Sequence, residues 1–268
     1  MDATNKNIAI VGAGNLGTSL VNGLIESNNF SATNFSLSRR KTTSLSSFNE
    51  KGCYVTKNNR EAVKNADIVV VAVLPQKIDE VLEEIASSLN QNQLIISLVT
   101  GVKVKEIQAQ MGENIPIVRA MPNTAIAIRE SMTCISTSHQ WKEHIPIVQE
   151  IFEQVGETVI INEDQMTSAT ALCACGVAFF LRAIRAATQG GTEIDFHASA
   201  ALKMAAQTAK GAASLLLQNN SHPEDEIDKV TSPKGCTIAG LNEMEHSGFS
   251  SSFIKGITTS AEKAKGLY

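Results

Sequence analysis

The sequence lacks the features that would direct it to nucleic acid or to a membrane. Its 23 Lys and Arg residues are outnumbered by 27 Asp and Glu residues, which gives a net charge of -4, so a basic nucleic-acid-binding surface is not expected. No continuous apolar run reaches the roughly 18 residues that span a bilayer. No charged segment followed by an apolar run opens the sequence, as a secretory signal would require. We therefore expect a cytoplasmic protein that binds neither nucleic acid nor a membrane.

Cysteines and histidines are few and scattered. The five cysteines are an odd number without C-x-x-C spacing, and the closest pair is Cys173 and Cys175. Residues two apart on a helix point to different sides, so we expect buried or loop thiols rather than a disulfide framework or a metal site. The five histidines show no metal-ligand spacing either. No metal is predicted.

The pattern of apolar and polar residues in the sequence changes near Asn162. Residues 1–162 alternate short apolar runs with amphipathic segments, and runs such as Ile68–Val73 are apolar throughout, which is typical of strands buried on both faces of a parallel sheet. This pattern predicts a doubly wound α/β domain of Rossmann type. The expected strands are Ile8–Val11, Phe35–Ser38, Ile68–Ala72, Leu94–Ser97, Ile115–Arg119, Met132–Ser136 and Thr158–Ile161. The expected helices are Leu16–Glu26, Thr42–Asn49, Arg60–Lys64, Ile78–Ser88, Val104–Met111 and Lys142–Gln154.

Residues 163–268 read as a second, all-α domain. Alanine-rich helical segments are expected at Asp164–Thr188, Asp195–Gln218, Ile238–His246 and Phe253–Lys265. The first of these is apolar on almost every side, so it has to be buried, and a domain of about a hundred residues offers limited cover. Burial against a second subunit is the preferred interpretation.

A glycine-rich turn follows the first strand. Gly12, Gly14 and Gly17 have G-x-G-x-x-G spacing between an apolar strand and an amphipathic helix. In this setting the first glycine permits the tight turn, the second lets a pyrophosphate approach the backbone, and the third lets helix and strand pack. The helix N-terminus adds free N–H groups and a favourable dipole. The motif predicts a dinucleotide site, and a purely structural turn is the alternative.

The end of the second strand indicates which dinucleotide. Dinucleotide folds usually carry an acidic residue there for the ribose 2′-hydroxyl, but this sequence has Arg39-Arg40-Lys41 and no acid between Glu26 and Glu50. Guanidinium groups bind phosphate, whereas a carboxylate would repel a 2′-phosphate. We predict NADP(H) in preference to NAD(H); an exposed basic turn would explain the arginines but not the missing acid. Later strand ends, at Val73-Leu74-Pro75, Ser97–Gly101 and Arg119–Thr124, are expected to line the nicotinamide crevice.

A second candidate site is the polar turn Val230–Leu241, which opens a helix. Small residues with free N–H groups at a helix N-terminus suit a carboxylate. The same pattern fits a simple capping turn with Ser232 or Thr237 as N-cap. The residues alone do not decide between these interpretations.

The sequence resembles the pyrroline-5-carboxylate reductases, which reduce a cyclic imine with NAD(P)H in proline biosynthesis. The resemblance runs nearly end to end. It is carried by Gly12–Gly17, Val73–Gln76, Arg119–Thr124, Ala206–Thr208 with Gly211–Ala213, and most specifically by Thr231–Leu241 followed by Glu245.

The resemblance implies a Rossmann domain, a helical dimerisation domain, and an active site between the cofactor of one subunit and the C-terminal loop of a neighbour in a homodimer or larger homo-oligomer. By this resemblance, the substrate would be held by Ser232, Gly235, Cys236 and Thr237, with Thr237 as candidate proton donor. Together with Gly14 and Arg40 from the motif and the basic run, the expected cofactor residues are Gly12, Asn15, Leu16, Gly17, Ser38, Arg39, Asn59, Ala72, Val73, Leu74 and Pro75.

Several positions depart from the family pattern. A lysine of the family is Leu74 here, its Ser-Gly-Ser-Gly-Pro-Ala stretch is Cys173–Ala178, a Glu-Ala is Arg185-Ala186, and its Gly-Gly-Thr-Thr is Lys234-Gly235-Cys236-Thr237. These changes surround the expected pocket, so a reductase of another small imino or keto acid is one alternative. A β-hydroxyacid-type dehydrogenase would need a lysine in Asp164–Thr188, which has none. A catalytically degenerate NADP-binding protein is the alternative outside the enzymes.

Overall fold

The computed structural model describes residues 3–265. They fall into two compact units: residues 3–174 with 261–265, called the sheet unit here, and residues 175–260, called the helical unit. The expected domain boundary between residues 162 and 163 lies before this division, just after the last strand, and stays a prediction.

The sheet unit is built on one eight-stranded sheet with the strand order β3-β2-β1-β4-β5-β6-β7-β8. All seven expected strands are present within a few residues, and the first, second and fourth of them match in full, whereas the short β3 is not expected from the sequence. The strands are β1 (Ile8–Val11), β2 (Phe35–Ser38), β3 (Tyr54–Thr56), β4 (Ile68–Val71), β5 (Leu94–Ser97), β6 (Ile117–Met121), β7 (Ser131–Thr137) and β8 (Gly156–Ile160).

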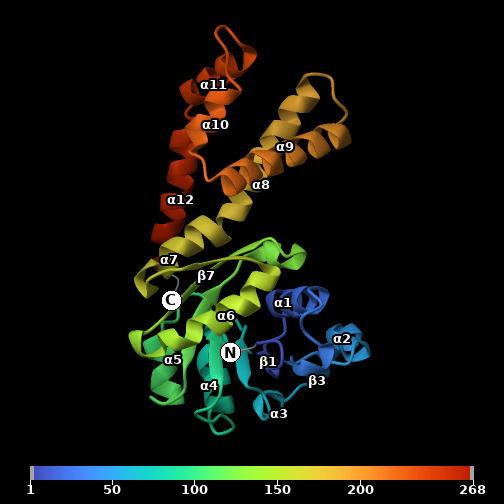
Figure 1. The fold of residues 1–268 in the computed structure, drawn as a ribbon, viewed down its shortest axis with the longest axis vertical. Coiled ribbons are helices and arrows are strands. Elements are labelled where there is room, and N and C mark those ends of the chain that lie inside the picture. The colour runs from blue at the N-terminus through green and yellow to red at the C-terminus, as the bar shows by residue number, and fades with distance from the viewer. Residues whose placement is uncertain (1–2, 266–268) are drawn as a thin grey trace. The chain divides into compact units, whose positions relative to one another are not determined.

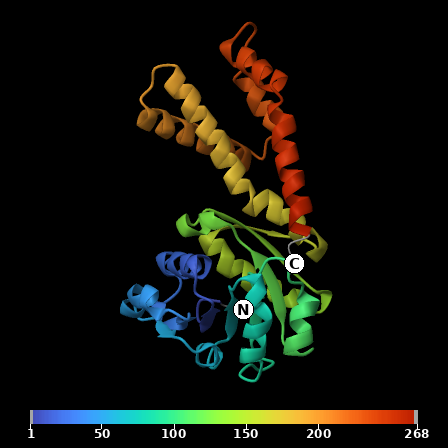
Figure 2. The same cartoon turned by 180° about the vertical axis from the view of Figure 1, so that it is seen from behind.

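Both faces of this sheet are covered by helices. Ile8 and Ile10 of β1 belong to one apolar core and Ala9 and Val11 to another, because successive side chains of a strand point to opposite faces. Helices α1, α2 and α6 contribute to the first core, and α4 and α5 contribute to the second. Figure 1 shows α6 in front of the sheet, and the opposite view in Figure 2 shows α4 and α5. The doubly wound α/β prediction is confirmed.

The helices of the sheet unit follow the strands in the order expected from the sequence. They are α1 (Asn15–Glu26), α2 (Ser46–Glu50), α3 (Asn59–Val63), α4 (Ile78–Ala86), α5 (Val104–Met111), α6 (Ile145–Phe152) and α7 (Met166–Ala169).

Strand direction changes after β6. Strands β1 to β6 are parallel, but β7 pairs antiparallel with β6, with Met121 opposite Cys134. The connection of residues 122–130 contains only the 3₁₀-helix Thr124–Ile128. A parallel crossover needs a dozen or more residues, so this short link places β7 antiparallel, and β8 then pairs parallel with β7.

The helical unit contains α8 (Gly176–Glu193), α9 (Ala198–Asn219), α10 (Pro223–Lys229), α11 (Cys236–His246) and the greater part of α12 (Phe249–Lys265). The sequence pattern predicts all of these except α10. Helices α8 and α9 pack closely, since a Cβ on Gly191 would lie 3.0 Å from that of Ala201. Phe253 contacts Phe179 and Phe180, with ring centroids 6.3 and 5.4 Å apart.

Very little of the helical unit is buried within one chain. Gly176 and Thr188 are the buried residues of α8, and Ala201 is the buried residue of α9. Large apolar side chains such as Phe180 and Leu181 are each 59% exposed. An apolar surface of this extent is characteristic of a protein interface, and burial of the segment 164–188 against a second subunit stays a prediction.

The segment Glu163–Glu193 is helical and apolar on average. By length and composition this helical stretch could cross a membrane, with a mean hydropathy of 1.6 in its most apolar window, of which 11% is buried. This mean includes polar residues, so it does not contradict the expectation that no continuous apolar run is long enough to span a bilayer. The expected single helix is also interrupted, because Thr170–Ala174 form a π-helix between α7 and α8.

Candidate active site

The glycine turn lies directly after β1. Gly12 has a φ of +84°, and a Cβ there would lie 2.5 Å from Cγ1 of Val73 and 2.9 Å from the carbonyl oxygen of Ala72. Residue 12 therefore has to be glycine for both backbone conformation and space. The N–H groups of Gly12 and Ala13 donate to the carbonyl of Ser38, which joins the turn to the end of β2.

The other two glycines have different roles. A Cβ on Gly17 would lie 2.8 Å from Cγ2 of Ile10, so this glycine lets α1 pack on β1. A Cβ on Gly14 would have only the carbonyl oxygen of Gly12 nearby, at 3.8 Å. Gly14 thus has open space beside it, which is what a close approach of a ligand to the backbone requires. Asn15 and Leu16 share the first turn of α1 with Gly17, and the first N–H groups of a helix have no partner within it.

These residues border a pocket of about 640 Å³ at the carboxyl ends of β1, β2 and β4. Nine of the thirteen predicted cofactor residues line it, namely Gly12, Gly14, Ser38, Arg39, Arg40, Asn59, Ala72, Val73 and Leu74. Asn15, Leu16, Gly17 and Pro75 are adjacent in the chain but are not among the lining residues. The segments Ser97–Gly101 and Arg119–Thr124, also expected to contribute, do not line it.

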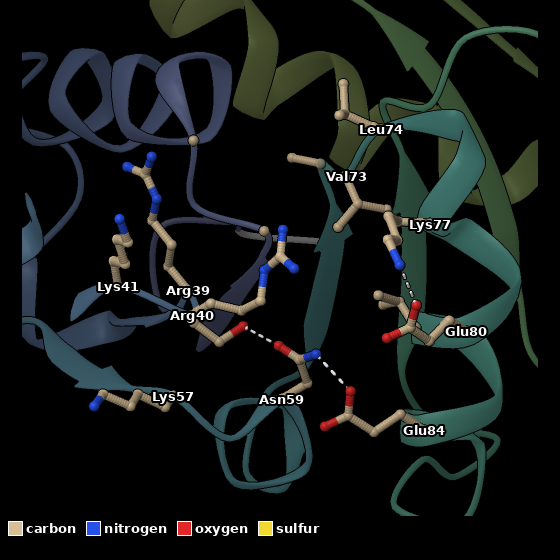
Figure 3. A pocket seen from close by; sticks show the side chains of 15 residues that line it. Arg39, Arg40, Lys41, Lys57, Asn59, Val73, Leu74, Lys77, Glu80 and Glu84 are labelled. Atoms are coloured by element: carbon tan, nitrogen blue, oxygen red, sulfur yellow. Dashed lines mark hydrogen bonds and ion pairs between the residues drawn. The ribbon is translucent and has the colours of Figure 1, made fainter.

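Five cationic side chains line this pocket, and one of them, Lys77, pairs with Glu80. Arg39, Arg40, Lys41 and Lys57 line it (Figure 3). Arg39 donates from Nη1 to Oγ of Ser44 at 3.0 Å, and Ser44 in turn donates to the carbonyl of Lys41, so the guanidinium is held by its own turn. A cluster of this kind fits a phosphate group.

The opposite wall of the pocket carries acidic groups. Figure 3 shows Lys77, Glu80 and Glu84 on the far side from Arg39 and Lys41. The Nζ of Lys77 lies 2.7 Å from Oε2 of Glu80, and this hydrogen bond lowers the pKa of the Glu80 carboxyl. Anions are therefore favoured on the arginine side and disfavoured on the α4 side.

A hydrogen-bond chain crosses the floor between the two sides. Oγ of Ser38 donates to Oδ1 of Asn59 at 2.7 Å, and Nδ2 of Asn59 donates to Oε2 of Glu84 at 2.7 Å. This chain fixes which end of the Asn59 amide faces each neighbour.

Lys57, Lys77, Glu80, Val81 and Glu84 line the pocket without being predicted. Lys57 follows β3, and the three residues of that strand are too few to form a recognisable apolar run. Had β3 been identified, the position of Lys57 at the carboxyl end of a parallel strand would have indicated a ligand contact.

The C-terminal loop gathers the four predicted substrate residues at the start of α11. Gly235 is the N-cap, its N–H donates to the carbonyl of Ser232 at 2.9 Å, and Cys236 and Thr237 form the first turn. A Cβ on Gly235 would lie 2.6 Å from Oγ of Ser232, so the loop is closed tightly. The alternative in which Ser232 or Thr237 is the N-cap is wrong, since α11 has no side-chain cap. Binding by these residues stays a prediction.

A buried ion pair lies where β6 meets the start of the 163–193 segment. Nη1 of Arg119 is 3.3 Å from Oε1 of Glu163, and the same oxygen accepts from the N–H of Val104 at 2.7 Å. Burial lowers the pKa of Arg119, and the charge of Glu163 opposes this shift. The pair thus connects three segments of the sheet unit.

Comparison with known proteins gives matches along the whole chain. Residues 163–267 match the family model "Pyrroline-5-carboxylate reductase dimerisation", and residues 7–101 match "NADP oxidoreductase coenzyme F420-dependent". Pyrroline-5-carboxylate reductase 2 of Dictyostelium discoideum is 46% identical over 276 residues, covering 97% of this chain and 92% of that protein. The chain belongs to the pyrroline-5-carboxylate reductase family. Pyrroline-5-carboxylate reductase 1 of the same organism is 48% identical over 280 residues, and this chain spans 51% of its length.

Solved structures of the family have the same fold. A pyrroline-5-carboxylate reductase from Coxiella burnetii superposes with a TM-score of 0.90 at 30% identity, covering 98% of each chain. The Plasmodium falciparum enzyme, whose crystal structure has NADP bound, superposes with a TM-score of 0.86 at 24% identity, again covering 98% of each chain. The predicted Rossmann domain followed by a helical dimerisation domain is confirmed.

Proposed function

We propose that this protein reduces 1-pyrroline-5-carboxylate to proline with NADPH as reductant. The observation that carries the proposal is the pocket in which the Gly12–Gly14 turn and four cations come together, in a chain of this family. The family match supports the reaction, and the pocket supports the cofactor.

The pocket fits a phosphorylated dinucleotide. Gly12 lets the turn lie close to Val73, and the open space beside Gly14 leaves the backbone accessible to a pyrophosphate. The free N–H groups at the start of α1 lie next to this position. Arg39, Arg40, Lys41 and Lys57 would hold the 2′-phosphate, and Asn59 would orient the ribose. Ala72, Val73, Leu74 and Pro75 would border the nicotinamide half. When bound, the cofactor supplies a hydride for the carbon of the C=N bond.

The loop at the start of α11 is the proposed substrate site. The N–H groups of Cys236 and Thr237 would bind the substrate carboxylate, because the first turn of a helix carries unpartnered donors and a favourable dipole. Ser232 and Gly235 would shape the loop around the ring. The hydroxyl of Thr237 would hold the imine nitrogen and donate a proton to it, and water would restore that proton.

The helical unit is proposed to form a homodimer, alone or within a larger homo-oligomer. The dimerisation model covers this part of the chain, and its exposed apolar side chains need a partner. We propose that a second subunit, and not a lipid bilayer, covers the exposed apolar side chains of α8, such as Phe180 and Leu181, and that the enzyme acts in the cytoplasm. Sedimentation without detergent should give at least twice the monomer mass; a monomer that binds liposomes would contradict this proposal.

Substitution of Thr237 tests the substrate site. Thr237→Val removes the hydroxyl at nearly constant volume, and we expect kcat with pyrroline-5-carboxylate to fall about a hundredfold, within the usual range for a lost proton donor. Thr237→Ser keeps the hydroxyl and should retain most activity. The Kd for NADPH should stay within about twofold in both variants. Equal activity of Thr237→Val and wild type would remove Thr237 from the mechanism, whereas activity confined to another cyclic imine would change the substrate.

A further inference from the structure

Two thiols from distant parts of the chain meet at the carboxyl end of β6. Sγ of Cys134, on β7, donates a hydrogen bond to Sγ of Cys173, and the two sulfurs are 3.7 Å apart. Cys173 belongs to the π-helix Thr170–Ala174. Both residues lie in the sheet unit, and 39 positions separate them in sequence.

The environment of this pair is apolar and rich in sulfur. Met121, Cys134 and Met166 form a small buried core against which Cys173 packs. Oγ1 of Thr170 lies 2.8 Å from Sδ of Met121. The thioethers of Met121 and Met166 thus lie in the same small core as the pair.

The two thiols differ in their access to solvent. Cys134 is 1% exposed, whereas Cys173 is only half-buried. A small oxidant can therefore reach Cys173 first, whereas Cys134 is buried beside it. This is the arrangement of a reacting thiol and a resolving thiol.

We propose that Cys134 and Cys173 form a modification site at which a hydroperoxide converts the two thiols into a reversible disulfide. The Cys173 thiolate attacks the peroxide O–O bond, which gives a sulfenic acid on Cys173 and releases an alcohol, or water in the case of hydrogen peroxide. The sulfur of Cys134 then attacks the sulfenic sulfur, its proton leaves with the hydroxyl group as water, and the S–S bond forms. In total, two thiols lose two electrons and two protons, and one peroxide is reduced.

The electrostatics of the pair fit these roles. The hydrogen bond from Cys134 lowers the pKa of Cys173 from its ordinary value of 9.0 to about 7, while the same interaction and burial raise the pKa of Cys134. The thiolate is the form that reacts with peroxides. Cys53, which is also buried, instead has its pKa raised by desolvation.

Forming the bond requires the two thiols to move closer together than the 3.7 Å that separates them. A disulfide needs its sulfurs about 2.05 Å apart, so the two side chains must approach further than they do as thiols. Cys173 lies in a π-helix, a conformation that often accompanies functional sites. Its carbonyl accepts a hydrogen bond from Nδ2 of Asn123 at 3.3 Å. A shift of Cys173 on disulfide formation would therefore also move the segment that follows β6.

Peptide mapping of the full chain tests the proposal. The protein is treated with equimolar hydrogen peroxide, free thiols are blocked with iodoacetamide, and tryptic peptides are compared with and without dithiothreitol. Trypsin separates residues 130–142, with Cys134, from residues 143–182, with Cys173 and Cys175. We expect a cross-link between these two peptides that dithiothreitol removes, with Cys53 and Cys236 still alkylated.

Three variants identify which cysteines form the cross-link. Cys175→Ser, two residues from Cys173, is the matched control and should keep the cross-link. Cys173→Ser should abolish it. Cys134→Ala should also abolish it and leave a sulfenic acid on Cys173 that dimedone traps, with circular dichroism confirming that the variant folds. A cross-link that persists in Cys173→Ser, a Cys173–Cys175 disulfide, or no cross-link in wild type would overturn the proposal. None of these readouts depends on reductase activity.

Discussion

Gly12 and Val73 approach each other so closely that a Cβ on Gly12 would lie 2.5 Å from Cγ1 of Val73. The two residues come from the turns after β1 and β4, which form one edge of the pocket. The Gly12→Ala variant must shift one of these turns and also hold alanine at a φ of +84°, a conformation that strains any residue with a side chain. We expect a Kd for NADPH at least tenfold weaker and a lower Tm, measured by calorimetry.

Gly14→Ala separates these two effects. Its Cβ has open space apart from one oxygen at 3.8 Å, so the Tm should stay near that of wild type while a bound pyrophosphate loses its close contact. The expected result is weaker NADPH binding at unchanged stability. A Gly14→Ala protein that binds NADPH as wild type does would move the pyrophosphate away from this turn.

Arg39 should discriminate between the two nicotinamide cofactors. Arg39→Ala removes a guanidinium that Ser44 holds in place, and we expect the Kd for NADPH to rise at least tenfold, which corresponds to about 1.4 kcal/mol. NADH lacks the 2′-phosphate, so its Kd should change less than twofold. Lys105→Ala, on an exposed position of α5, is the charge-matched control and should change neither. Equal weakening of both cofactors would contradict the assignment.

The Arg119–Glu163 pair should contribute to stability. Glu163→Ala leaves the buried Arg119 without its counter-ion and Val104 N–H without its acceptor. Because the side chain of Glu163 is 23% exposed, we expect a loss of about 2 kcal/mol in the free energy of unfolding, somewhat below that for a fully buried pair. Glu163→Gln keeps an acceptor and should lose less.

Denaturant titration measures these differences. Glu157→Ala, on an exposed position of β8, is the control and should lose no more than about 0.5 kcal/mol. Equal stability of Glu163→Ala and Glu157→Ala would show that the ion pair contributes nothing.

The reactivity of Cys173 should depend on pH in a defined direction. With a pKa of about 7, the thiolate fraction rises as the pH increases through 7 and is nearly complete above about 8. The rate of Cys173 alkylation by iodoacetamide, followed by mass spectrometry, should rise and level off accordingly. Cys134→Ala removes the hydrogen bond that lowers this pKa, so its midpoint should move to higher pH. An unmoved midpoint would assign the shift to another cause.

The architecture of the sheet unit could be predicted because its strands are buried on both faces. Continuous apolar runs such as Leu94–Ile96 and the glycine spacing at residues 12–17 are local signals, and both lead to the doubly wound sheet. The three-residue β3 has no such signal, so it was not expected, and Lys57 was missed with it. The antiparallel direction of β7 follows from the shortness of its connection, which strand patterns do not report.

Contacts between distant residues could not be predicted in the same way. Cys134 and Cys173 are 39 positions apart in the sequence, with α6, β8 and α7 between them, and nothing in their spacing indicates that they meet. The Arg119–Glu163 pair is likewise a product of folding. The substrate loop differs, because its residues are adjacent in the sequence and can be identified there. The sequence leaves open whether Ser232 or Thr237 caps the helix or a ligand binds its first N–H groups. The structure assigns the N-cap to Gly235.

The pocket and the loop are proposed to serve one reaction, the reduction of a cyclic imino acid by NADPH. The most direct test supplies the purified full chain with pyrroline-5-carboxylate and NADPH, follows the nicotinamide absorbance, and quantifies proline by mass spectrometry. We predict one proline formed for each NADPH consumed, with faster turnover at low cofactor concentration for NADPH than for NADH. NADPH that binds tightly but is not consumed, with no proline formed, would contradict the account.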